Sequence, residues 1–260
     1  MRILAIGDVC GQGGTGMLLK NLPELKKKYG VDFTVVNGEN CDDSNGISPD
    51  GAHLIFSAGA DVITGGNHTL RRKDFRPLLD ENDRLLRPHN LRDAEYGSGY
   101  CLVDMGYCQV AVINLLGTIY LEKENATNPF TSAEELVDRA EADGANIILV
   151  DFHAEATSEK RALGFMLDGK VSAVFGTHTH VQTADVQILP QGTAYITDLG
   201  MTGPIHSVLG VKPEIIIDRL KNDGKERFAL AEGACSLEGF LFDVDIKTGK
   251  ASCPEIIRIL

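Results

Sequence analysis

Short apolar runs alternate with amphipathic stretches along the first third of the chain. Apolar runs predict strands at Arg2–Gly7, Asp32–Asn37 and Asp61–Thr64. The intervening stretches predict helices at Gly16–Tyr29, Pro49–Ala58 and Arg71–Asn82. This alternation of strand and helix favours a mostly parallel sheet.

The pattern changes after residue 98, where strands begin to follow one another directly. A β-hairpin is predicted from Gly99–Met105 and Gln109–Asn114. Further helices are predicted at Ser132–Asp143, Thr157–Leu167 and Lys212–Leu220. Further strands are predicted at Asn146–Asp151, Val171–Phe175, Val186–Leu189, Ala194–Thr197, Arg227–Glu232, Gly239–Ile246 and Ile256–Leu260. Two packed sheets with helices outside would accommodate the strands and helices predicted in both halves of the chain. Since no linker interrupts them, we expect one domain over residues 1–260.

Composition and charge exclude several classes of function. The formal net charge is −12 over 260 residues, which disfavours binding to extended nucleic acid because the phosphate backbone is itself anionic. No apolar run reaches the roughly 18 residues that suggest a transmembrane helix, so no membrane association is expected. The apolar run at the N-terminus is too short for a secretory signal, and we expect a cytoplasmic protein. Six cysteines without a CxxC pair indicate reduced thiols.

Acids, amides and histidines follow five of the predicted strands directly. They are Asp8, Glu39 with Asn40, Asn67 with His68, His153, and His178 with His180. Ligand sites in open α/β sheets form at the carboxyl ends of strands, so these side chains should converge. Mixed oxygen and nitrogen donors suit Fe, Mn, Zn or Co. An extended segment would place both imidazoles of His178 and His180 on one side, and the glycines before each cluster predict sharp turns.

Each cluster taken alone also has an ordinary structural interpretation. A strand-end aspartate often caps a helix, a single histidine is often a hydrogen-bonded structural residue, and asparagine is common in glycine-rich turns. Five such clusters in one chain favour a metal site over these separate explanations.

Longer motifs carry a resemblance to a known family. The segments GDVCG, NGEN, GGNHT, VDFHAEATSEK, GTHTHVQTAD and AYITDLGMTGP resemble the YmdB-type branch of the calcineurin-like metallophosphoesterase superfamily. The resemblance runs through nearly the whole chain. It implies a four-layer α/β/β/α sandwich of two mixed β-sheets with helices outside. Members of this branch are cyclic-nucleotide phosphodiesterases, and the branch suggests homo-oligomers.

The resemblance also implies a division of the ligands between two metal ions. One ion would be held by Asp8, Glu39, Asn40 and His180, and the other by Glu39, Asn67, His153 and His178. Glu39 would bridge the two ions, and His68 would be the catalytic acid. The chain departs from the superfamily in having Cys10 where a histidine is usual and Glu39 where an aspartate is usual. Asn40 then takes over the missing ligand role. We expect iron as the metal, with manganese or zinc as alternatives.

The resemblance also implies the reaction. A metal-bridging hydroxide would attack phosphorus in a 2′,3′-cyclic nucleotide, and His68 would protonate the leaving 2′ oxygen, giving a 3′-phosphate. A phosphomonoesterase or another metal-dependent hydrolase on the same fold is the alternative. Asp198 and Glu155 are candidates to hydrogen-bond the metal-bound imidazoles from outside.

Three further interpretations compete with a metallophosphoesterase. Gly11, Gly13 and Gly16, with Asp32 beyond them, form a literal dinucleotide-binding fingerprint. However, a carboxylate at Asp8 would repel pyrophosphate, and the histidines would have no role. An amidohydrolase would carry its HxH pair on the first strand of a barrel, and a non-enzymatic regulatory module would not need a complete ligand set.

Cys10 and Cys41 each stand beside a proposed ligand. We interpret both as small buried residues, with an oxidation-sensitive site as the alternative, because nearby cations depress thiol pKa values.

Overall fold

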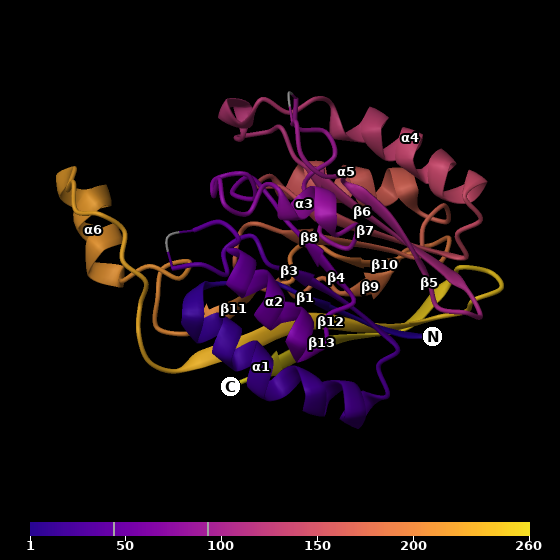
Figure 1. Cartoon of the computed structure of the whole chain (residues 1–260), viewed down its shortest axis with the longest axis horizontal. Helices are drawn as coiled ribbons and strands as arrows, with labels where there is room; N and C mark the ends of the chain where they lie inside the picture. Colours follow the sequence, from indigo (N-terminus) through magenta and orange to yellow (C-terminus); the bar gives the residue numbers. More distant parts are fainter. Residues whose placement is uncertain (44, 93) are drawn as a thin grey trace.

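The strands pair into two mixed sheets in a computed structural model that describes residues 1–43, 45–92 and 94–260 (Figure 1). The first sheet has the order β2 (Asp8–Val9), β11 (Met201–Pro204), β12 (Cys235–Val244), β1 (Arg2–Ile6), β3 (Phe33–Asn37) and β4 (Val62–Thr64), with β13 (Ala251–Ile259) also paired to β12. The second has the order β5 (Tyr100–Asp104), β6 (Gln109–Leu116), β7 (Ile147–His153), β8 (Ala173–Thr177), β10 (Ala194–Ile196) and β9 (Gln187–Ile188).

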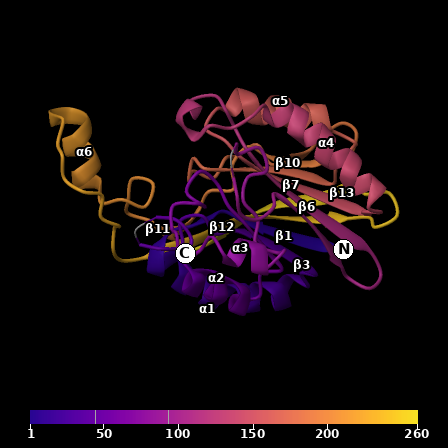
Figure 2. The same ribbon diagram turned by 45° about the horizontal axis from the view of Figure 1, so that its top comes forward.

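Helices cover the outer face of each sheet (Figure 2). Apolar residues of α1 (Gly11–Tyr29) and α2 (Pro49–Ala58) pack on the first sheet, and those of α4 (Pro129–Ala142) and α5 (Thr157–Leu167) on the second. A third cluster, including Phe33, Phe240 and Phe175, joins the inner faces of the two sheets. Within the described ranges, no helix has both the length and the apolar character needed to cross a membrane.

The parallel strands direct their carboxyl ends to a common edge. β1, β3 and β4 are parallel neighbours in one sheet, and β6, β7 and β8 in the other. A hydrogen bond of 3.0 Å from Asn37 Nδ2 to Asp151 Oδ2 joins the end of β3 to β7 in the opposite sheet. The two sets of strand ends therefore meet, which is where the predicted ligands stand.

The helix predicted over Arg71–Asn82 is wrong except for α3 (Leu78–Glu81). Pro77 lies inside the predicted range, and proline disfavours helical backbone in the residue before it. Turns replace the helix before that point. The Arg76 guanidinium stabilises them by donating to the Leu70 carbonyl oxygen at 2.7 and 2.9 Å.

The segment between β11 and β12 also differs from expectation. The strand predicted over Arg227–Glu232 is reduced to an isolated bridge between Leu230 and Val211 in the part of the chain that is described. α6 (Pro213–Asn222) projects away from the sheets in both views (Figures 1 and 2). Ile215 alone is buried among its described residues. β11 was not predicted, because its sequence, MTGP, has no apolar alternation.

Candidate metal centre

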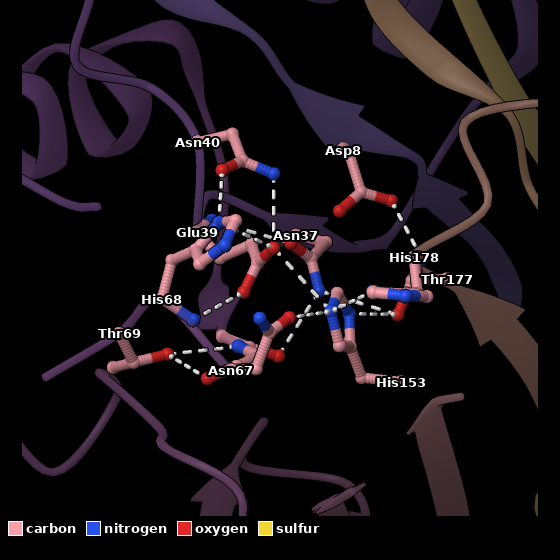
Figure 3. Close-up of polar contacts among 12 residues, drawn as sticks. Asp8, Asn37, Glu39, Asn40, Asn67, His68, Thr69, His153, Thr177 and His178 are labelled. Atoms are coloured by element: carbon pink, nitrogen blue, oxygen red, sulfur yellow. Dashed lines mark hydrogen bonds and ion pairs between the residues drawn. The ribbon is translucent and has the colours of Figure 1, made fainter. Parts of the chain in front are cut away.

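The eight predicted site residues all lie at the shared edge where the strands end, and Figure 3 labels all of them except His180. They come from β2, the loop after β3, the turn after β4, the last residue of β7 and the bend after β8; they are Asp8, Glu39, Asn40, Asn67, His68, His153, His178 and His180. Asp8, Glu39 and His153 are almost fully buried. The predicted convergence is thus confirmed, while the assignment of each residue to a metal ion stays a prediction.

Nitrogen and oxygen atoms crowd together around His153. Its Nε2 lies 3.3 Å from Glu39 Oε1, 3.1 Å from Asn67 Oδ1 and 3.0 Å from His178 Nδ1. One ligand atom each from Glu39, His153 and His178 can be chosen so that all lie within 4.8 Å of one another. Such a set of inward-facing donors is what a transition-metal ion requires.

A second group of donors gathers around His180. Its Nε2 lies 3.7 Å from Asp8 Oδ1 and 3.3 Å from Asn40 Nδ2, so Asn40 presents to His180 its amide nitrogen, which is not a metal ligand. Asp8 Oδ2 accepts a hydrogen bond from the His178 backbone N–H at 3.1 Å. The fully buried Asp8 Oδ1, in contrast, has no hydrogen-bond partner among the described residues. A buried carboxylate oxygen without a partner is costly, and a cation would satisfy it. The residues present therefore fit a metal ion.

The charges in the cluster act differently on its members. Burial raises the pKa of Glu39, but attraction to His153 outweighs burial and holds this pKa well below its usual range. Burial lowers the pKa of His153, whereas the Glu39 charge raises it, to about 9 overall. Burial and the charge of His153 lower the pKa of His178 to about 3. Glu39 is therefore ionised and His178 neutral, as metal coordination requires, whereas His153 must lose a proton before its Nε2 can coordinate.

The segment that carries His178 and His180 is not extended, so the placement of both imidazoles on one side, which an extended segment would give, does not apply. Both residues have positive φ, 98° and 62° respectively. Such backbone costs on the order of 1–3 kcal/mol per residue and is held in place by its surroundings. Here Asp198 Oδ2 accepts from the Thr179 N–H at 3.1 Å. The bend turns His178 toward His153 and His180 toward Asp8, so the two imidazoles serve different groups of donors.

Two residues that the sequence did not single out hold His153 from behind. Thr177 Oγ1 donates to Asp151 Oδ1 at 2.7 Å and lies 2.9 Å from His153 Nδ1. Because the threonine proton is directed to the carboxylate, its oxygen accepts from the Nδ1–H of His153. This fixes the tautomer that leaves Nε2 free to coordinate. The sequence signal that could have identified these two residues is a polar side chain within an otherwise apolar strand, Asp151 in β7 and Thr177 in β8.

Glu155 and Asp198 were both predicted to hydrogen-bond the coordinating imidazoles, and only Glu155 lies beside one. Glu155 Oε2 lies 3.1 Å from His178 Nε2, as expected for a carboxylate behind a coordinating imidazole. The expectation for Asp198 is wrong. Its carboxylate pairs with the buried Lys160 ammonium at 2.7 Å and accepts from the Thr179 backbone. Asp198 therefore shapes the bend instead of orienting an imidazole.

His68 stands at the margin of the cluster with 18% of its side chain exposed. Its Nδ1 donates to Asn40 Oδ1 at 2.7 Å and lies 3.3 Å from Glu39 Oε1. Its backbone N–H donates to Glu39 Oε2 at 3.0 Å. With Nδ1 engaged, Nε2 is the ring atom available to a substrate.

The glycines before the clusters provide space more than backbone freedom. None of Gly7, Gly38, Gly66 and Gly176 has a positive φ, so no turn there requires the left-handed conformation that favours glycine. A Cβ atom on Gly66 would lie 2.2 Å from Glu39 Oε2 and 2.3 Å from His153 Nε2. A side chain at residue 66 would therefore occupy the centre itself.

The structure also bears on the dinucleotide-binding fingerprint and on the two cysteines beside the proposed ligands. Gly11, Gly13 and Gly16 lie within α1 and form no phosphate-binding loop, which removes the dinucleotide-binding interpretation. Burial raises the pKa of Cys10 well above its usual value, and that of Cys41 to about 11. Both thiols are buried, in agreement with their interpretation as small buried residues, and the oxidation-sensitive alternative stays a prediction.

A cavity of about 350 Å³ opens beside the cluster. Its lining includes Glu39, Asn40, His68, His178 and His180. It also includes apolar residues from the segment around α6. The candidate metal centre is therefore accessible to a small molecule.

Comparison with known proteins agrees with this geometry. The chain is 47% identical over 260 residues to a 2′,3′-cyclic-nucleotide 2′-phosphodiesterase of Bacillus subtilis, covering 100% of this chain and 97% of that protein. A phosphatase crystal structure from Mycoplasma pneumoniae is 38% identical, with a TM-score of 0.94 over 100% of this chain and 93% of that one. A hypothetical protein from Thermus thermophilus is 34% identical, with a TM-score of 0.91 over 100% and 99% of the two chains.

A more distant likeness concerns the fold alone. A 5′-nucleotidase precursor, also from Thermus thermophilus, is 14% identical, with a TM-score of 0.55 over 100% of this chain and 54% of that one. The model of the YmdB-like protein family matches residues 4–257. The resemblance noted in the motifs is thereby confirmed, and the chain belongs to the YmdB-like family.

Proposed function

We propose that this protein is a metal-dependent phosphodiesterase that hydrolyses 2′,3′-cyclic nucleotides to 3′-phosphates. The observation that carries the proposal is the buried donor cluster beside an open cavity, with Asp8 Oδ1 lacking a hydrogen-bond partner among the described residues. The activity named for the Bacillus subtilis relative supports the choice of substrate.

Two metal ions form the proposed centre, with iron preferred and manganese or zinc as alternatives. Asp8, Glu39, Asn40 and His180 would hold one ion, and Glu39, Asn67, His153 and His178 the other. The amide oxygen of Asn40 has two lone pairs, so it can accept from His68 and still face a metal. When bound, the ions would supply Lewis-acid activation of water and neutralise charge on the phosphoryl oxygens.

His68 is proposed as the general acid. Asn40 Oδ1 holds its Nδ1, which directs Nε2 toward the cavity that His68 lines. When both ring nitrogens of His68 carry a proton, the proton on Nε2 would be transferred to the leaving 2′ oxygen. General acid catalysis of this kind typically contributes about 10²–10⁴-fold in rate. Glu39 also orients His68, because its carboxylate accepts a hydrogen bond from the His68 backbone N–H.

The architecture is proposed to be a four-layer α/β/β/α sandwich that forms one metallophosphoesterase domain over residues 1–260. Three apolar clusters support the layers: one between the sheets and one beneath each pair of helices. Ligands from both sheets support a single domain. The family also favours a homo-oligomer, for which sedimentation of the purified protein is the test.

A substrate panel tests the activity. Iron- and manganese-loaded protein should hydrolyse 2′,3′-cyclic nucleotides faster than 3′,5′-cyclic nucleotides and phosphomonoesters. Preferential hydrolysis of phosphomonoesters would replace the proposed activity with that of a phosphomonoesterase. Metal analysis should give two ions per chain.

Two variants test the residue assignments. His68→Ala should retain two metals and lose most turnover, and full activity with both metals bound would refute the acid role. Asn67→Ala should lose metal, and normal metal content with normal turnover would refute its place among the ligands.

A further inference from the structure

We propose that the apolar wall of the cavity beside the metal centre, formed by Val208, Leu209, Val211, Ile216, Phe228 and Leu230, binds the nucleobase of the substrate, with Phe228 stacking on it. This inference rests on the proposed function. It assigns the base to a segment that contributes none of the predicted metal ligands.

The wall and the donor cluster line the same cavity of about 350 Å³. The cluster contributes carboxylate, amide and imidazole groups to the lining, and the wall contributes aliphatic and aromatic carbon. A nucleotide has the same division, since its phosphate is anionic and its base presents a π-face. The two parts of the lining therefore match the two ends of a cyclic nucleotide.

Backbone pairing fixes which side chains form the wall. Val211 and Leu230 are directly opposite in an antiparallel bridge, so their side chains project to the same face. The Lys212 N–H donates to the Ala229 carbonyl at 3.0 Å, and the Ala231 N–H donates to the Gly210 carbonyl at 2.9 Å. Phe228 precedes Leu230 by two residues and lines the same cavity.

The wall is also tied to the metal centre. The Leu209 carbonyl oxygen lies 3.2 Å from His180 Nδ1. His180 Nε2 faces Asp8 and Asn40 on the other side of its ring. One imidazole thus connects the proposed ligands to the wall and sets the separation between phosphate and base.

Phe228 is suited to stacking. It is 54% exposed, although it is a large apolar residue. The Arg219 guanidinium carbon lies 4.2 Å from its ring centroid, and Arg219 donates to the Glu226 carbonyl at 2.7 Å. The cation therefore supports one face of the ring and holds its orientation. Stacking tolerates any base, because every base has a π-face.

Two substrates separate base recognition from chemistry. Adenosine 2′,3′-cyclic phosphate and glycerol 1,2-cyclic phosphate share a five-membered cyclic phosphodiester, but only the first carries a base. Phe228→Ala should lower kcat/KM for the adenosine compound by about tenfold, mainly through KM, which is within the range of base–aromatic stacking. The glycerol compound should be hydrolysed at an unchanged rate. Phe228→Trp should restore the loss.

Ile217→Ala is the matched control, because Ile217 lies on the same segment, is 58% exposed and does not line the cavity. It should leave both substrates unaffected. Equal losses on both substrates with Phe228→Ala, or no loss on either, would overturn the base subsite. A loss with Ile217→Ala as large as that with Phe228→Ala would do the same.

A binding measurement keeps the two proposals distinguishable. Calorimetric titration with adenosine, which has no phosphate, should show binding that Phe228→Ala weakens. If the loaded protein hydrolyses neither cyclic diester, the proposed function fails, and the titration alone decides the subsite. Absence of adenosine binding, or equal binding by wild type and Phe228→Ala, would then refute it.

Discussion

Thr177 Oγ1 lies 2.9 Å from His153 Nδ1 and donates its own proton to Asp151. This arrangement fixes the imidazole with Nε2 toward Glu39, so residues beneath the cluster determine how well it binds a cation. Thr177→Val keeps the shape of the side chain but removes the hydroxyl. We expect metal affinity to fall about 10- to 100-fold, as is typical when an outer partner is lost.

Competition with a chromophoric chelator measures this affinity. Thr177→Ser retains the hydroxyl and should stay close to wild type. Unchanged affinity in Thr177→Val would show that the hydrogen bond does not influence the centre.

Gly66 leaves no room for a side chain between Glu39 and His153. Gly66→Ala should therefore lose metal content and activity together. Gly16→Ala is the control, because a Cβ atom there meets nothing within 4 Å and Gly16 lies in α1. It should stabilise the helix by about 0.5–1 kcal/mol. Normal metal content in Gly66→Ala, measured by elemental analysis, would contradict the described geometry.

Metal binding should stabilise the folded protein. A ligand that binds only the native state adds about 2.7 kcal/mol at a free concentration of 100 times its Kd. Adding manganese to chelator-treated protein should therefore raise Tm in wild type. Glu39→Gln, which removes the proposed bridging charge at constant size, should abolish most of this increase. Equal increases in both proteins would exclude Glu39 from the ligands.

Lys160 and Asp198 form a buried ion pair at 2.7 Å behind the bend that carries His178. Removing one partner leaves a buried charge and typically costs about 3–5 kcal/mol. Lys160→Met should lower the free energy of unfolding by this amount in urea denaturation. The double variant Lys160→Met with Asp198→Asn should recover part of the loss. No recovery would indicate that Lys160 acts mainly through its 2.8 Å hydrogen bond to the Thr177 carbonyl.

The sequence was most informative where local pattern determines position. An apolar strand followed at once by a polar group places that group at the carboxyl edge, and this predicted the convergence of Asp8, Glu39 and His153. The motifs then identified the family. Neither source predicted the Thr177–Asp151 pair, because its importance depends on side chains from four strands meeting across two sheets.

Tertiary contacts also explain features that the sequence did not predict. His178 and His180 adopt positive φ because neighbouring groups hold the bend, and no local pattern encodes that. The segment around Leu230 pairs through an isolated bridge while α6 projects from the body, so its apolar residues form a cavity wall instead of a strand. Pro77 was a local signal that could have shortened the helix predicted around it.

The hydrogen bond between Asn37 and Asp151 joins residues 114 positions apart in the chain. Contacts of such large separation close late, because the loop between them must first lose its freedom. The donors can gather only after both sheets have docked, so metal ions have no assembled site to bind early in folding. Bound metal should therefore slow the rate of unfolding and leave the rate of folding nearly unchanged.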